Sequence, residues 1–146
     1  MRVALQVQYA VHGIFDLAYN GDGSPIQLRQ IGERQGIPAR YLEQIFQRLR
    51  RAGLVRSKRG PGGGYTLARA PAEISLRDIV DAVEGSTGEA RRTGRMRGNH
   101  GPAFLWPVLE KQFAELLAET SIEDLCRQAS RAAVRRAHPD AQTYVI

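Results

Sequence analysis

The fold is decided by residues 28–68, LRQIGERQGIPARYLEQIFQRLRRAGLVRSKRGPGGGYTLA. Apolar residues at helical spacing predict a short helix over 28–35, and Gly36 follows where helices commonly end in a left-handed residue. Pro38 suits the start of a helix, because the first N–H groups have no intrahelical partner, so a second helix is expected over 38–52. Two short helices around a tight glycine turn are typical of a helix-turn-helix, whose second helix enters the major groove of DNA.

The helix expected over 38–52 has a packed face and a polar face. Apolar side chains at i, i+3, i+4 and i+7 predict the packed face, which consists of Leu42, Ile45, Phe46 and Leu49. Cationic and amide side chains form the opposite stripe, which consists of Arg40, Gln44, Gln47, Arg48 and Arg51. Gly32 supplies the small residue that a close crossing of the two helices needs. An ordinary helical hairpin with a solvated basic face would look the same up to this point.

A β-hairpin is predicted immediately after this helix. Residues 54–58 and 65–68 are strand-like, and the intervening 59–64, RGPGGG, is a glycine-dense tip. A hairpin in this place is the wing of a winged helix, and its basic tip can reach a minor groove. The alternative is a phosphate-binding loop of an enzyme. It is disfavoured because neither a Lys-Ser or Lys-Thr pair nor a helix follows the glycines.

Positive charge is concentrated in the same stretch. The chain of 146 residues has 21 basic and 15 acidic side chains, a net charge of +6. Residues 27–69 alone contain ten basic side chains against Glu33 and Glu43, so the remainder of the chain is slightly acidic. Such segregation is the pattern expected for binding to nucleic acid, where neutralised phosphates supply most of the non-specific affinity. The preference for arginine over lysine has a second explanation, a genome rich in G and C.

The composition is that of a globular protein, with 42% hydrophobic and 25% charged residues. No apolar run reaches the length of about 18 residues that a membrane helix needs. The single cysteine, Cys126, cannot form an intramolecular disulfide or a site that needs several thiolates. We therefore expect a cytoplasmic protein that does not bind membranes.

The rest of the chain is predicted to be helical, apart from one loop and the tail. A first helix is expected over 3–19 and a fourth over 75–84, where Ser75 and Asp78 resemble a capping box. The polar stretch 86–101 has no periodicity and predicts a loop. Apolar pairs predict a long helix over 103–118, followed by a short helix that Thr120 or Ser121 caps, with its inward face formed by Ile122, Leu125, Cys126 and Ala129. The long helix suits either a partner helix across a two-fold axis or packing within the chain.

These elements predict a mainly α fold with a small β-hairpin. Residues 1–85 form a winged helix-turn-helix DNA-binding domain, 86–101 a loop, 102–130 the dimerisation helices and 131–146 a tail.

A family resemblance is carried by YLEQIFQRLRRAGLVRSKRGPGGGYTLAR, residues 41–69, by QYAV at 8–11 and by ISLRDIV at 74–80. Together these motifs resemble the IscR/NsrR/CymR-type (Rrf2) family of bacterial winged-helix transcriptional regulators. The resemblance implies a homodimer on double-stranded DNA, with recognition helices in successive major grooves and wings in minor grooves. By position it implies a base-reading stretch at Arg40, Tyr41, Glu43 and Gln44, and a wing tip at Arg59, Pro61 and Gly62.

The chemistry of these side chains agrees with those roles. Gln44 can bind adenine with two hydrogen bonds, Glu43 can accept one from cytosine, and Arg40 can reach guanine or a phosphate. Two of these side chains have other interpretations. Tyr41 could bind a phosphate or be partly packed, and Glu43 could pair with Gln47 or Arg50 on its own helix. Further along the helix, Arg48 and Arg51 are expected to contact phosphates.

The chain departs from the family in the loop. Cluster-binding relatives carry three cysteines there, but residues 85–106 contain none. His100 is the only histidine in that segment and is interpreted as a solvated loop residue, and Cys126 is interpreted as a buried apolar residue. We therefore expect no iron–sulfur cluster, metal or other cofactor. Arg91, Arg92, Arg95 and Arg97 could bind an anionic effector or touch DNA.

The sequence thus predicts a sequence-specific transcriptional regulator, with repression as the expected mode. The alternative is a winged-helix regulator that acts mainly through a protein partner such as a metabolic enzyme, and a small-molecule effector also remains open. An enzyme is not expected, because no nucleophile is paired with a base: His12 lies on the first helix, His138 in the tail, and the carboxylates are scattered.

Overall fold

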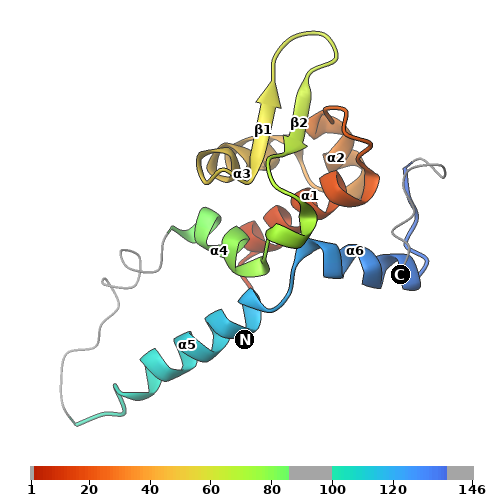
Figure 1. The fold of residues 1–146 in the computed structure, drawn as a ribbon. Coiled ribbons are helices and arrows are strands. Elements are labelled where there is room, and N and C mark those ends of the chain that lie inside the picture. The colour runs from red at the N-terminus through yellow and green to blue at the C-terminus, as the bar shows by residue number, and fades with distance from the viewer. Residues whose placement is uncertain (1, 86–99, 138–146) are drawn as a thin grey trace.

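The computed structural model describes residues 2–85 and 100–137. It is mainly helical, and every helix predicted from the sequence is present within two residues of the expected start. The elements are α1 (Leu5–Asn20), α2 (Leu28–Gln35), α3 (Ala39–Arg51), β1 (Val55–Lys58), β2 (Gly64–Leu67), a short 3₁₀ turn (Pro71–Glu73), α4 (Leu76–Glu84), α5 (Leu105–Ala118) and α6 (Ile122–Arg131) (Figure 1). Most of the expected loop, 86–99, and the tail beyond 137 lie outside the described residues.

The helix-turn-helix of α2 and α3 forms as its glycines predict. Gly36 ends α2 in the left-handed conformation, with φ of 68°, and its N–H donates to the carbonyl of Gly32. A Cβ at Gly32 would lie 2.5 Å from the carbonyl oxygen of Ile37. Only a residue without a side chain therefore allows this close approach. The apolar face of α3 is buried as predicted, and Leu42, Phe46 and Leu49 are fully enclosed.

A buried carboxylate joins α1 to α2. Asp16 is completely buried and accepts hydrogen bonds from Arg34 Nε and Nη2, Gln35 Nε2 and Asn20 Nδ2. The hydrogen bond to this carboxylate raises the pKa of Arg34. The charge on Asp16 is therefore compensated inside the fold, which is the condition for burying it.

The hairpin pairs β1 with β2 antiparallel, with Val55 opposite Leu67 and Lys58 opposite Gly64. Ile26 adds a backbone bridge that the sequence analysis did not predict: its N–H and carbonyl bond Tyr65 over 2.9 and 2.8 Å. A single bridging residue has no alternating pattern, so it left no periodic signal. The bridge fixes β2, near the tip end of its pairing with β1, against the segment that leads into α2.

The N-termini of α4 and α6 are held side by side. Ser75 and Ser121 cap them, each in a capping box with an aspartate three residues on, as expected for Ser75. The N–H of Leu76 bonds the carbonyl of Thr120, and the N–H of Ile122 bonds that of Ile74. In Figure 1, α5 extends from this junction as an arm away from the rest of the molecule. No residue of α5 is buried, whereas Ile122, Cys126 and Ala129 of α6 face the core as predicted.

Candidate nucleic-acid interface

The outward stripe of α3 is the first part of the interface. Arg40, Glu43, Gln44 and Arg51 are all exposed on this helix. The buried apolar face opposite fixes their direction, because α3 cannot rotate without exposing its core residues. No ion pair joins Glu43 to Arg50 in the part of the chain that the structure describes. Arg50 Nη1 instead donates to the hydroxyl of Ser57 over 3.3 Å. That bond ties α3 to β1.

Tyr41 is partly packed, which is one of the two interpretations that the sequence left open. Its side chain is 43% exposed, yet its ring lies 6.2 Å from that of Tyr9 on α1. Arg40 Nη2 donates to the Tyr41 hydroxyl over 3.2 Å, and the guanidinium carbon lies 4.9 Å from the ring centre. The neighbouring arginine is therefore oriented by the tyrosine. A phosphate contact by Tyr41 stays a prediction.

Arg48 is exposed, yet its guanidinium is hydrogen-bonded to two other helices of the protein. Its Nη1 donates to the carbonyl oxygen of Val83 in α4 over 3.0 Å and to Oε1 of Gln6 in α1 over 3.3 Å. The sequence showed only that Arg48 lies on the polar side of α3, and gave no sign that α4 ends beside it. The phosphate contact expected of Arg48 stays a prediction. Nη1 of its guanidinium already has two acceptors within the protein.

The wing tip is the second part of the interface. Arg59, Pro61 and Gly62 are exposed there, at the end of the hairpin that projects beyond α2 and α3 in Figure 1. A turn in which the N–H of Gly63 donates to the carbonyl of Gly60 over 2.9 Å keeps the tip narrow. The recognition helix and the wing therefore present their predicted contact residues from adjoining elements.

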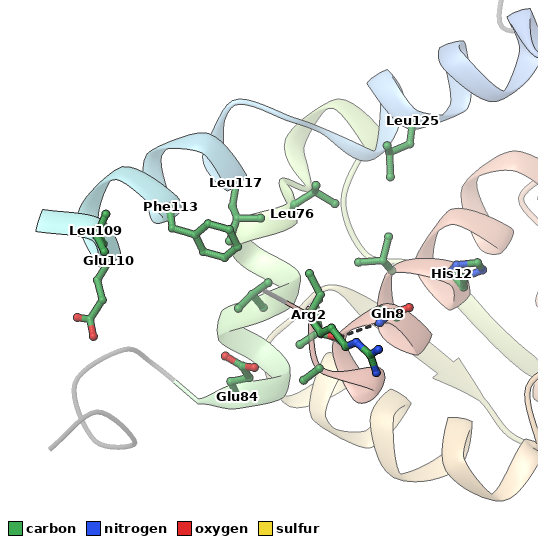
Figure 2. Close-up of a pocket in the computed structure, with 15 residues that line it drawn as sticks. Arg2, Gln8, His12, Leu76, Glu84, Leu109, Glu110, Phe113, Leu117 and Leu125 are labelled. Carbon is green, nitrogen blue, oxygen red and sulfur yellow. Dashed lines mark hydrogen bonds between the residues drawn. The ribbon is translucent and has the colours of Figure 1, made fainter. Parts of the chain in front are cut away.

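A groove not foreseen from the sequence lies at the base of the α5 arm. It has a volume of about 670 Å³ and is lined mainly by α1 with the residues just before it, by α4 and by α5, and also by Leu125 of α6. Figure 2 shows Leu109, Phe113 and Leu117 of α5 along one wall, with Glu84 near one end and His12 toward the other. Its walls come from three segments far apart in the chain, so no local motif could reveal it.

Comparison with known proteins identifies the architecture. The family model for Rrf2, described as an iron-dependent transcriptional regulator, matches residues 4–128. The chain belongs to the Rrf2 family. It is 40% identical over 129 residues to the HTH-type transcriptional regulator IscR of Photorhabdus laumondii, covering 86% of this chain and 79% of that one. It is 44% identical over 117 residues to IscR of Cronobacter sakazakii, covering 80% and 72%.

Solved structures of the same family share the fold. IscR of T. potens aligns with a TM-score of 0.77 at 33% identity, covering 94% of each chain. CymR, the global cysteine regulator of B. subtilis, aligns with a TM-score of 0.73 at 30% identity, covering 88% of this chain and 98% of that one. The protein is thus a DNA-binding transcription regulator of the Rrf2 family with a winged helix-turn-helix. Within the described ranges, no helix is long and apolar enough to cross a membrane.

Within the described residues, no set of side chains fits an iron–sulfur cluster. Cys126 is fully buried in α6, and burial raises the pKa of its thiol to about 11, which disfavours the thiolate that ligation requires. His100 is exposed, and the described residues contain no group of three side chains able to hold a metal ion. Cluster ligation needs about four side chains, mostly thiolates, and this chain has one cysteine.

Proposed function

We propose that this Rrf2-family protein acts in the cytoplasm as a homodimeric, sequence-specific repressor that binds DNA without a cluster or other cofactor and has no enzymatic activity. The observation that carries the proposal is the α5 arm. Its apolar side chains are open to solvent, with Leu116 at 60%, Trp106 at 49% and Phe113 at 39% exposure. A contiguous apolar surface of this kind marks an interaction site, and two-fold pairing of identical chains is the commonest way to cover one.

The dimer would present two copies of the interface to DNA. In each copy, the exposed Gln44 would bind adenine, Glu43 would accept from cytosine, and Arg40 would reach guanine or a phosphate. Arg51 would bind a phosphate, and the wing would bring Arg59 to the minor groove, with Pro61 stiffening the tip beside Gly62. Pairing through α5 would set the spacing of two half-sites about one helical turn, or a multiple of it, apart.

The test combines the mass of the protein in solution with selection of its DNA site. We expect light scattering during size-exclusion chromatography to give twice the chain mass. Selection from random duplexes should enrich an inverted repeat, and a mobility shift with that duplex should show one specific complex. A monomer in solution would contradict the dimer. Failure to enrich any sequence would contradict specific DNA binding and would favour a regulator that acts through a protein partner.

A further inference from the structure

Arg48 does not lie at the centre of the DNA-facing stripe of α3. At about 100° per residue, Arg40, Gln44 and Arg51 fall together on the outer side of the helix, and Arg48 falls on the flank that it shares with Tyr41. The contacts agree with this placement. Tyr41 lies against Tyr9 of α1, and Arg48 reaches Val83 and Gln6, whereas Arg50 on the opposite flank bonds the hairpin.

The C-terminal end of α4 provides a reason for this contact. The last carbonyls of a helix have no intrahelical partner, and the helix dipole favours a positive charge beside them. The last turn of α4 has no basic residue, and it contains Asp81 and Glu84 instead. Arg48 supplies the missing cation from another helix, and its bond to the carbonyl oxygen of Val83 is charge-assisted.

The place of this bond in the chain gives it a functional meaning. At Glu84 and Gly85 the chain leaves the DNA-binding region and continues through 86–99 to the α5 arm. Arg48 therefore joins the recognition helix to the C-terminal end of α4, the last described element before the chain continues toward α5. Gln6, the second acceptor, lies in the first turn of α1, so three helices meet at one guanidinium.

We infer that Arg48 is a positioning residue for DNA recognition. It holds α3 against the C-terminal end of α4, so that the outer stripe meets the bases at a fixed angle, and its charge is used on the helix end instead of on a phosphate. The inference rests on the proposed DNA contacts of the outer stripe, and it separates Arg48 from Arg51, which has a phosphate-binding role in that proposal.

The test compares Arg48→Met with Arg51→Met in the full chain. Methionine keeps much of the aliphatic stem and removes the hydrogen-bond donors and the charge. For Arg48→Met we expect affinity for the selected duplex to fall about tenfold, while affinity for random duplex and the slope of log K against log salt change little. For Arg51→Met we expect both affinities to fall and the slope to drop by about one unit. Each variant is measured well below its Tm.

Two outcomes of this experiment would overturn the inference. A slope reduced by about one unit in Arg48→Met would identify Arg48 as a phosphate ligand. A lower Tm with both affinities unchanged would make it a purely stabilising contact. Arg48→Lys, which keeps a cationic donor of similar reach, should restore most of the preference for the selected duplex.

The guanidinium NMR signals of the wild-type protein give a measurement that does not depend on the folding of a variant. When the selected duplex is added, the Arg48 signal should keep its chemical shift and the Arg51 signal should move. Equal movement of the two signals would contradict the positioning role. If the wild-type protein selects no duplex at all, the proposed function fails. If it selects a duplex normally and Arg48 behaves as a phosphate ligand, only this inference is contradicted.

Discussion

The DNA-binding body, formed by α1 to α4 with the hairpin, and the α5 arm are both built from amphipathic helices, but only the body encloses its apolar faces. Ile14, Leu42, Phe46 and Ile79 are completely buried in the body, while α5 has no buried residue. The same helical periodicity therefore leads to a core in one region and to an exposed surface in the other. The body is therefore enclosed within one chain, whereas the exposed apolar side of the arm supports the proposed pairing with a second one.

The largest effect is expected in the body, at the buried carboxylate. Asp16→Ala removes the acceptor of four hydrogen bonds and leaves Arg34 without its anion. Breaking a buried pair in this way costs roughly 3–5 kcal/mol. We expect urea denaturation to show that loss in the free energy of unfolding. Glu33→Ala, which breaks only the exposed pair with Arg29, is the control and should change it by less than about 0.5 kcal/mol. A loss for Asp16→Ala as small as the control would contradict the structural role.

A substitution in the α5 arm should change the association of two chains and leave the stability of the body unchanged. Leu116→Glu places a charge on the exposed apolar side of α5 and should weaken the dimer by at least about 2 kcal/mol, or roughly thirtyfold in the dissociation constant. Sedimentation equilibrium measures this change, and circular dichroism should show an intact body. Ala118→Glu adds the same charge on the other side of the helix and should leave the dimer unchanged. Equal weakening by both variants would show that α5 does not pair through this face.

Base reading by α3 is the next effect in size. Gln44→Ala should cost about 1–3 kcal/mol on the selected duplex and relax the base preference at one position of each half-site. The reason is the loss of an amide that can form two hydrogen bonds with adenine. Repeating the selection with the variant measures this directly. An unchanged sequence motif would remove Gln44 from the base-reading residues.

The wing should contribute through the shape of the DNA. Arg59→Ala should weaken specific binding more than non-specific binding, with the largest loss on sites whose flanks are A-tracts, because a narrow minor groove attracts arginine. Duplexes that share one core and differ only in their flanks make the comparison. Equal loss on all flanks would reduce Arg59 to a phosphate contact.

Removal of iron by a chelator is expected to have the smallest effect on DNA binding. The purified protein should be colourless, and chelation should leave its DNA affinity unchanged, because one buried cysteine cannot assemble a cluster. A visible absorption band that disappears on chelation, together with altered DNA binding, would require cluster ligands other than cysteine thiolates.

The raised pKa of Cys126 also predicts slow alkylation of the native protein at pH 8, with fast alkylation only after unfolding.

The sequence by itself determined the local structure and the chemistry on offer. Helical periodicity, the glycine at position 36, the capping residue Ser75 and the glycine-dense hairpin tip each act within a few residues, and all were readable in order along the chain. The motif of residues 41–69, with the arginine before it, also placed Arg40, Gln44 and Arg59 on exposed parts of α3 and the wing. These properties depend on neighbours in sequence, which is why a single chain reveals them.

Only the tertiary structure decided what each polar side chain meets. The pattern of α3 grouped Arg48 with Arg51, and both side chains are exposed, but the fold brings the end of α4 within hydrogen-bond distance of Arg48. The charge on Asp16 gave no sign of burial, and its partners lie 18 and 19 residues away on α2. The bridge at Ile26 and the groove beside α5 likewise join distant segments. Periodicity tells which side of its own helix a residue occupies, whereas the packing of the whole chain determines which atoms lie opposite.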